Sequence, residues 1–377
     1  MDIEMYKQGA KVLTATPQCK ECKYFIKGNA QHCLKYKEEK KPSYVMFPSK
    51  ECPSFNHKNP VHIKICDKVE NQVKGGIFGF CIGDALGVPL EFTSRAERKK
   101  DPVKEMRAYG TYHQPFGTWS DDSSMLLCLV ENIAEGYSLE GLAGKFVLFG
   151  TQGYMTPHQQ VFDIGNSTRM AIQRISNGIA PIECGGKDEN DNGNGSLMRI
   201  LPLAYYLKGK PFQEQIKVAE DVSSITHAHD RSKLACIIYI QIAISLLEGK
   251  EKKAAYVDSI EYVKQNMPEH YQRELQTYSR IFGSQILLLS EAEISSSGYV
   301  VDTLEAAVWS FLTTDSYEEA VFKAINLGGD TDTIAAIAGG LAGLYYGFSG
   351  IRETWLQCLV KNKEINELLD RFIEKVR

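Results

Sequence analysis

The chain has 377 residues, of which 43% are hydrophobic and 24% charged, as is typical of a soluble globular protein with a sizeable core. Its net charge of −4 argues against a protein devoted to nucleic acid, because such domains usually carry a basic surplus. The longest uncharged run, 334–351, approaches the length of a membrane span. Five glycines interrupt this run, so we expect a buried helix there and no membrane segment.

Residues 1–58 differ from the rest of the chain in charge and in cysteine content. They hold eleven lysines against six acidic residues. They also contain four cysteines: Cys19, Cys22, Cys33 and Cys52. A Cys-x-x-Cys pair followed by two further thiols can complete a tetrahedral zinc site, with His32 or His57 as a substitute ligand. An iron–sulfur cluster could use the same thiolates, and reduced thiols in a loose tail are the simpler alternative. We predict a small zinc-binding module over 1–58, followed by a linker over 59–66.

The N-terminus and the remaining cysteines indicate a cytoplasmic protein. The first residues, Met1-Asp2-Ile3-Glu4, are acidic, which is unlike a signal peptide. Six further cysteines are scattered through the chain, several of them inside apolar helical patterns. Such isolated cysteines are typical of reduced, buried thiols. We therefore expect a cytoplasmic protein, and a monomer.

Helical periodicity dominates from residue 67 onwards, and no sustained period-2 alternation or internal repeat is present. A polar loop is expected over 101–116. Asp302 to Glu305 and Ser316 to Glu319 have the spacing of capping boxes, which predicts two helices ending near Leu312 and Leu327. Other helices are expected over 67–86, 139–149, 167–176, 196–207, 230–248 and, with a break at Pro268, 251–282. We predict an all-α fold with one compact multi-helix domain over 67–377.

Two clusters of hydroxyl and carboxylate residues stand directly before apolar helical runs. Ser120-Asp121-Asp122 precedes 125–133, and Gly329-Asp330-Thr331-Asp332-Thr333 precedes 334–348. Each cluster alone could be a capped helix start with solvated aspartates. Crowded carboxylates repel one another unless a cation neutralises them, and such oxygens are ligands that Mg²⁺ prefers. Together the clusters offer four carboxylates and two hydroxyls, the ligand set of a site for two cations.

These clusters belong to an ordered series of motifs. The others are GIFGFCIGDALGVPLEF at 76–92, DIGNSTR at 163–169, GNGSLMR at 193–199 and ITH at 225–227. In this order, from about residue 70 to residue 350, the chain resembles the ADP-ribosylglycohydrolase family. The resemblance implies an all-α fold and an enzyme that releases ADP-ribose from a modified side chain. Residues 1–58 lie outside it.

The resemblance also implies which residues form the site. The ligands of two Mg²⁺ ions, or of Mn²⁺, would be Ser120, Asp121, Asp122, Asp330, Asp332 and Thr333, and Asp332 would share in the chemistry. Asp163 would support the ligands from beside the metals. Glu91 would be the catalytic acid or base, and Asp191, near the glycine loop, is a weaker candidate for that role. Without the resemblance, Glu91 reads as a glutamate at the surface end of a helix.

The glycine loop is expected to hold the diphosphate of ADP-ribose. Backbone N–H groups ahead of a helix favour anions, although a Gly-x-Gly loop by itself is most often a plain turn. The resemblance implies that Gly193, Asn194, Gly195 and Ser196 contact the substrate and that His227 lies beside it. Outside this context His227 reads as a packing or capping histidine. His229, two residues further on, cannot share a helix face with it.

We therefore expect a Mg²⁺-dependent hydrolase that acts on an ADP-ribosylated protein and releases ADP-ribose. An arginine linkage is slightly favoured over serine. One alternative is a protein that binds ADP-ribose without catalysis. Another is a hydrolase acting on ADP-ribosylated nucleic acid and steered by the basic residues of the N-terminal module.

Overall fold

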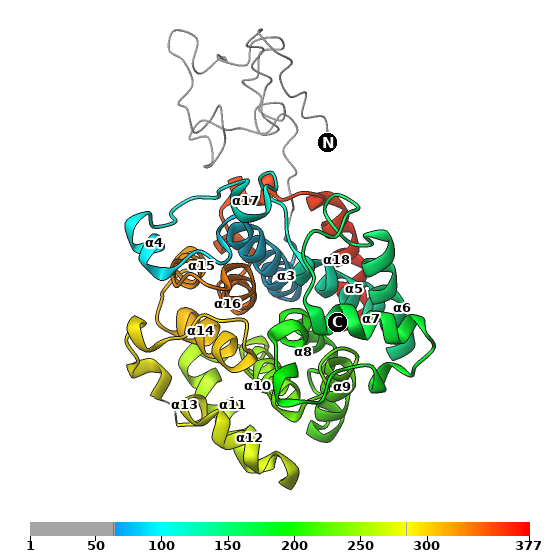
Figure 1. Cartoon of the computed structure of the whole chain (residues 1–377). Coiled ribbons are helices and arrows are strands. Elements are labelled where there is room, and N and C mark those ends of the chain that lie inside the picture. Colours follow the sequence, from blue (N-terminus) through cyan, green and yellow to red (C-terminus); the bar gives the residue numbers. More distant parts are fainter. Residues whose placement is uncertain (1–62, 64, 284) are drawn as a thin grey trace, which may run out of the picture.

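The computed structural model describes residues 63, 65–283 and 285–377, so the predicted four-cysteine zinc module lies outside the described residues. In the described part every regular element is an α- or 3-10 helix, which confirms the all-α prediction there (Figure 1). The α-helices are α3 Lys68–Gly87, α4 Arg95–Lys100, α5 Asp121–Ala134, α6 Leu139–Gln152, α7 Asn166–Ser176, α8 Pro202–Leu207, α9 Phe212–Ser224, α10 Asp230–Leu247, α11 Lys252–Asn266, α12 Gln272–Thr277, α13 Ser279–Phe282, α14 Val300–Leu312, α15 Tyr317–Asn326, α16 Thr331–Tyr346, α17 Glu353–Cys358 and α18 Asn362–Val376.

Helices α3 and α16 form the centre of the fold and run antiparallel, side by side (Figure 1). Their backbones touch, because α3 carries a glycine at every fourth position of the face that meets α16. A Cβ added at Gly79 would overlap the carbonyl oxygen of Gly339, and one at Gly83 would overlap that of Ala335. At the end of α3 a Cβ on Gly87 would overlap the Cα of Asp332. The glycine face therefore fixes the start of α16 against the end of α3.

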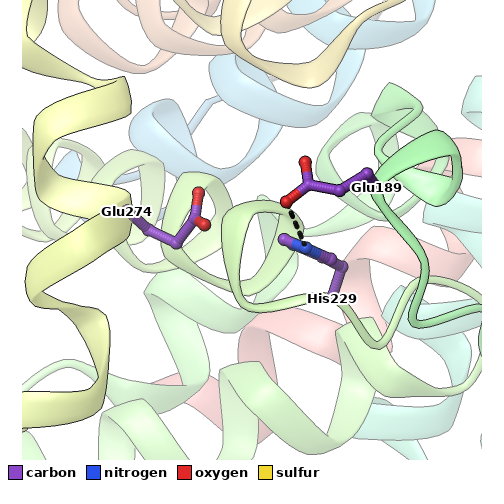
Figure 2. A group of neighbouring side chains, drawn as sticks. All are labelled: Glu189, His229 and Glu274. Atoms are coloured by element: carbon purple, nitrogen blue, oxygen red, sulfur yellow. Dashed lines mark ion pairs between the residues drawn. The ribbon is translucent and has the colours of Figure 1, made fainter.

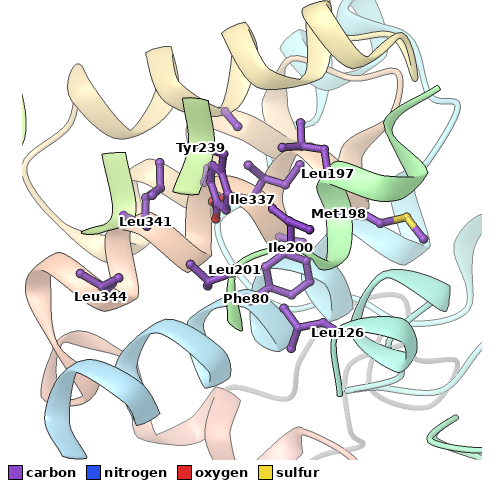
Figure 3. Packing of buried hydrophobic residues seen from close by; sticks show 14 of the residues in the cluster. Phe80, Leu126, Leu197, Met198, Ile200, Leu201, Tyr239, Ile337, Leu341 and Leu344 are labelled. Atoms are coloured by element: carbon purple, nitrogen blue, oxygen red, sulfur yellow. The ribbon is translucent and has the colours of Figure 1, made fainter. Parts of the chain in front are cut away.

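The hydrophobic core joins this pair to the surrounding helices. Figure 3 shows Phe80 of α3 and Leu126 of α5 packed with Leu201 and with Ile337 of α16. Tyr239 of α10 donates a hydrogen bond of 3.0 Å to the carbonyl oxygen of Ile337, so its hydroxyl is satisfied inside the core. Helix α10 is buried along nearly its whole length, which explains its continuous apolar sequence.

Two of the expected helix boundaries are wrong. The segment expected as one helix over 196–207 is a 3-10 helix, η5 Asn194–Arg199, followed by α8, because Pro202 has no N–H and takes the first position of a new helix. The capping box at Asp302 does not form. Helix α14 already begins at Val300, and the Asp302 carboxylate instead accepts hydrogen bonds of 2.6 Å from Ser295 and Ser297.

Two expected helix boundaries are confirmed. Ser316 caps α15 by accepting a 3.1 Å hydrogen bond from the N–H of Glu319, and α11 ends ahead of Pro268. Ile63 and Ile65, inside the segment expected as a linker, pack against the core. Among the described residues, one helical stretch, Lys68–Leu90, is long and apolar enough to cross a membrane, and its apolar window is entirely buried within the fold.

The contact between α3 and α16 predicts opposite effects for two glycine substitutions. Gly79→Ala should lower the free energy of unfolding by about 1–3 kcal/mol, because its methyl group meets the backbone of α16. Gly144 lies on α6 with nothing within 4 Å of an added Cβ. Gly144→Ala should therefore raise the free energy of unfolding by about 0.5–1 kcal/mol. Urea titrations of both variants measure this, and equal effects would contradict the backbone contact.

Candidate active site

The Ser120-Asp121-Asp122 cluster forms the N-terminus of α5. Ser120 is the N-cap residue, and its Oγ accepts a hydrogen bond of 3.3 Å from the N–H of Asp122. All three side chains are buried. Since the helix N-terminus is the positive end of the helix dipole, the local structure favours two acidic residues here.

The second cluster forms the N-terminus of α16. Gly328 and Gly329 have φ values of +72° and +74°, which residues with a side chain rarely adopt, and this turn directs the chain into the helix. The N–H of Gly329 donates to the carbonyl oxygen of Thr93 at 2.8 Å. The hydroxyl of Thr331 donates to the carbonyl oxygen of Gly87 at 2.9 Å. The cluster is thereby attached to the end of α3.

Asp84 of α3 holds the first cluster in place, a role that the sequence did not reveal. Its carboxylate accepts hydrogen bonds from the N–H groups of Ser120, at 2.9 Å, and Ser123, at 3.0 Å, and from the Ser123 hydroxyl, at 2.6 Å. Burial raises the pKa of Asp84 to about 6, while these hydrogen bonds lower it. The sequence feature that could have pointed to this role is an aspartate inside a glycine-rich apolar helix, because a carboxylate is buried only where hydrogen bonds or a cation compensate for the loss of water.

The structure brings Glu91, Asp163 and Asp332 together. One carboxylate oxygen of each lies within 4.8 Å of the others. Burial, and next the charge of Asp163, raise the pKa of Glu91 to about 8. Burial is also the first cause that raises the pKa of the carboxyls of Asp121, Asp122 and Asp332 well above the usual range, with repulsion by neighbouring carboxylates added to it.

This arrangement fits a metal centre. Within residues 63, 65–283 and 285–377, no hydrogen-bond partner reaches three buried carboxylate oxygens: Oε2 of Glu91, Oδ2 of Asp122 and Oδ1 of Asp330. A buried acceptor without a donor is costly, and a divalent cation would remove both that cost and the mutual repulsion. The ligand atoms available to such a cation are carboxylate and hydroxyl oxygens, which suit a hard cation.

The glycine loop lies beside this centre. Asn194 donates hydrogen bonds from Nδ2 to Asp330 Oδ2, at 2.7 Å, and to Thr303 Oγ1, at 3.0 Å. A Cβ on Gly195 would lie 2.7 Å from Cε1 of His227, and one on Gly193 would lie 3.5 Å from its Nε2. The structure thus brings together the loop and the histidine that the sequence singled out.

Two predicted site residues of this region, Ser196 and Asp191, point away from the carboxylate centre. The Ser196 hydroxyl is fully buried and accepts a hydrogen bond of 2.9 Å from the Ser223 hydroxyl, so it faces the core. The Asp191 carboxylate accepts a hydrogen bond of 3.0 Å from the N–H of Asp188 and lies against Gly186. Asp191 thus closes its own turn, η4 Glu189–Asp191, and is not part of the Glu91, Asp163 and Asp332 group.

His227 is buried and neutral. Burial, and next the charge of Arg199, lower its pKa to about 3. Its Nδ1 lies 2.8 Å from the Thr226 hydroxyl, which leaves Nε2 on the side of the glycine loop.

A second group of Glu189, His229 and Glu274 resembles a metal site by spacing alone (Figure 2). His229 Nε2 lies 3.7 Å from Glu189, an interaction drawn as a dashed line in Figure 2. However, Arg231 already supplies a positive charge to both glutamates, at 2.8 Å from Glu189 and 2.7 Å from Glu274. This group is an ion-pair network that ties the loop before Gly193 to α10 and α12.

Comparison with known proteins identifies the class of enzyme. A model of the ADP-ribosylglycohydrolase family matches residues 66–377, and the chain belongs to this family. It is an ADP-ribosyl glycohydrolase, and the family is metal-dependent.

Individual relatives agree with this assignment. The chain is 32% identical over 304 residues to the ADP-ribosylarginine hydrolase Tri1 of Serratia proteamaculans, covering 80% of this chain and 78% of the relative. It is 28% identical over 298 residues to the ADP-ribosyl-[dinitrogen reductase] glycohydrolase of Rhodospirillum rubrum, covering 77% and 91% of the two chains. A solved "ADP-ribosylglycohydrolase-related protein complex" aligns with a TM-score of 0.68 and 26% identity over 82% of this chain and 99% of that chain.

The hydrogen bonds to Asp84 predict different effects for two buried serines. Ser123→Ala should lower the free energy of unfolding by about 1.5–3 kcal/mol, because a buried carboxylate loses a hydroxyl donor. Ser310 is equally buried, but within the described residues its hydroxyl has no partner, so Ser310→Ala should be neutral or stabilising. Denaturant titrations of the two variants measure the difference, and a harmless Ser123→Ala would refute the role of Asp84.

The buried histidine predicts a pH effect. Because the pKa of His227 is about 3 in the folded protein against an ordinary 6.5, only the unfolded chain binds this proton between these values. The contribution of His227 to stability is therefore complete above pH 6.5 and declines as the pH falls towards 3. His227→Gln should lose less stability than the wild type between pH 7.5 and 5 in thermal unfolding. Parallel pH profiles would show that His227 is not buried in its neutral form.

Proposed function

We propose that the chain is a Mg²⁺-dependent hydrolase that releases ADP-ribose from arginine side chains of modified proteins. The observation that carries the proposal is the crowding of buried carboxyl groups. Glu91, Asp163 and Asp332 lie within 4.8 Å of one another, and Asp122 and Asp332 are each affected by the charge of Asp330. Glu91, Asp122 and Asp330 each have an oxygen without a hydrogen-bond partner among the described residues. The arginine linkage is supported by two relatives named ADP-ribosylarginine hydrolase, which are 32% and 30% identical to this chain.

The metal ligands would come from both helix starts. Ser120, Asp121 and Asp122 of α5 would face Asp330, Asp332 and Thr333 of α16, and Asp163 would support them from the segment before α7. Bound metal ions would orient the ribose hydroxyls and lower the pKa of an attacking water. The chain itself holds the two sets of ligands in register through Asp84 and Gly87, which both belong to α3.

Glu91 is the residue placed to move a proton. Its side chain is buried next to Asp332 and Asp163, and its Oε2 has no hydrogen-bond partner among the described residues. A departing guanidine nitrogen must gain a proton when the bond to the ribose breaks, and a carboxyl group at this position can donate it. Asp191 closes the η4 turn, and we assign it to the support of the glycine loop rather than to this proton transfer.

The glycine loop would hold the diphosphate. The N–H groups of Gly193, Gly195 and Ser196 would face the anion, and the His227 ring lies against both glycines. Asn194 is oriented by its hydrogen bonds to Asp330 and Thr303 and would link the diphosphate subsite to the metal centre. A neutral His227 can donate a hydrogen bond from Nε2 to the same group without adding a charge.

Release of ADP-ribose tests the proposal directly. The purified full chain should release ADP-ribose from an ADP-ribosylarginine peptide with Mg²⁺ present, and EDTA should abolish the release. Asp332→Ala and Asp121→Ala should each lower kcat/KM by at least about 100-fold, because each removes a proposed metal ligand. Asp315→Ala is the control. The side chain of Asp315 is 96% exposed, so this substitution should leave activity unchanged.

Three outcomes separate the alternatives. Unchanged activity in Asp121→Ala would overturn the metal assignment. Faster release from an ADP-ribosylserine peptide would move the linkage to serine. Tight binding of ADP-ribose without release from either peptide would point to a binding protein or to a nucleic-acid substrate.

A further inference from the structure

Phe92 is the one exposed phenylalanine in the described part of the chain, with 72% of its surface accessible. It directly follows Glu91. Its backbone has a φ of +63°, an unfavourable conformation for a bulky residue. The N–H of Phe92 donates to the carbonyl oxygen of Gly329 at 2.7 Å, which ties this conformation to the turn that enters α16. Such strain is retained where the surrounding structure aims a side chain at a site.

Two further rings extend Phe92 into a row. The ring centroids of Phe92 and Tyr112 are 6.5 Å apart, and those of Tyr112 and Phe162 are 5.2 Å apart. The three rings come from separate segments: the turn after η1 Val88–Leu90, the η2 turn Gly110–Tyr112 and the segment between α6 and α7. We call Phe92, Tyr112 and Phe162 the aromatic ledge.

The ledge is joined to the proposed catalytic carboxylates. The Tyr112 side chain acts to lower the pKa of both Glu91 and Asp163, against the larger effect of burial, and Phe162 directly precedes Asp163 in the sequence. The Thr111 hydroxyl donates to the carbonyl oxygen of Glu91 at 2.7 Å, which holds η2 against the end of η1. The ledge therefore stands next to the carboxyl group that would protonate the departing side chain.

The strain is concentrated in the segments that carry the ledge. Seven non-glycine residues of the described chain have a positive φ. Five of them lie within 92–113 or 153–163: Phe92, Tyr109, His113, Met155 and Gln159. Within the described residues no lysine or arginine lies over any of the three rings, whereas other aromatic residues are covered in this way, as Trp309 is by Lys323 at 3.9 Å. Among the described residues, then, no cation of the chain occupies these rings, and Phe92 is the most exposed of the three.

We propose that the aromatic ledge binds the guanidinium group of the modified arginine and so determines which linkage is cleaved. This proposal rests on the function proposed above. A guanidinium is a planar cation that stacks on aromatic faces, and the carboxylate of Asp163, next to Phe162, adds attraction. A serine hydroxyl has neither the charge nor the plane, so the ledge favours arginine.

Phe92→Leu removes the exposed ring face and retains an apolar side chain at the same strained position. Because stacking acts in the bound substrate and in the transition state alike, KM for an ADP-ribosylarginine peptide should rise about 3- to 10-fold with kcat nearly unchanged. The affinity for ADP-ribose, which lacks the guanidinium, should be unchanged. Tyr262→Leu removes another partly exposed ring, on α11, and is the matched control.

A binding measurement separates this proposal from the proposed function. Agmatine, a small guanidinium compound, is titrated into the full-length protein saturated with Mg²⁺ and ADP-ribose. Its dissociation constant should rise about 3- to 10-fold in Phe92→Leu, whereas the constant for an uncharged urea analogue should not change. Agmatine binding can be measured whether or not the wild type cleaves the arginine peptide. A lack of turnover would therefore contradict the proposed function but not the binding of a guanidinium by the ledge.

Two results would overturn the proposal. The first is agmatine that fails to bind or that binds wild type and Phe92→Leu equally. The second is a loss of affinity for ADP-ribose itself in Phe92→Leu, which would assign the ledge to the adenine ring instead.

Discussion

The backbone contact between α3 and α16 is the constraint on which the site depends. The glycines of α3 let the two helices approach without intervening side chains, and the contact continues to Gly87 and Asp332. The Thr331 hydroxyl donates a hydrogen bond to the carbonyl oxygen of Gly87. One turn earlier in α3, the Asp84 carboxylate accepts a hydrogen bond from the N–H of Ser120 at the start of α5. One helix end therefore positions two clusters that are more than 200 residues apart in the sequence. A side chain at these glycines would separate the two halves of the site.

Crowding of carboxylates is the second constraint, and the molecule meets it in two ways. At Glu189 and Glu274, Arg231 lies between the acidic groups and neutralises them. At the starts of α5 and α16 and at Glu91, three buried carboxylate oxygens are left without a partner among the described residues. Folding around such a group is unfavourable unless a ligand compensates for it. Both groups consist largely of acidic residues, so residue type does not distinguish the ion-pair network from the proposed metal site. The position of Arg231 does.

The features that depend on local sequence pattern could be predicted from the sequence. Hydroxyl and aspartate residues before apolar runs marked the starts of α5 and α16, and the periodicity gave the all-α fold of the described domain. The break at Pro202 was missed because the apolar stripe continues through it. Asp84, Tyr112 and the inward Ser196 hydroxyl could not be assigned, since their partners lie on other segments and spacing within one segment carries no information about them.

Anomalous diffraction from crystals grown with Mn²⁺ is the most direct measurement of the central claim. We expect two peaks between Ser120-Asp121-Asp122 and Asp330-Thr331-Asp332-Thr333, because buried carboxyl groups of the two clusters repel one another and Asp122 and Asp330 each have an oxygen without a partner among the described residues. The absence of a peak at this place, or a peak between Glu189, His229 and Glu274 instead, would contradict the account.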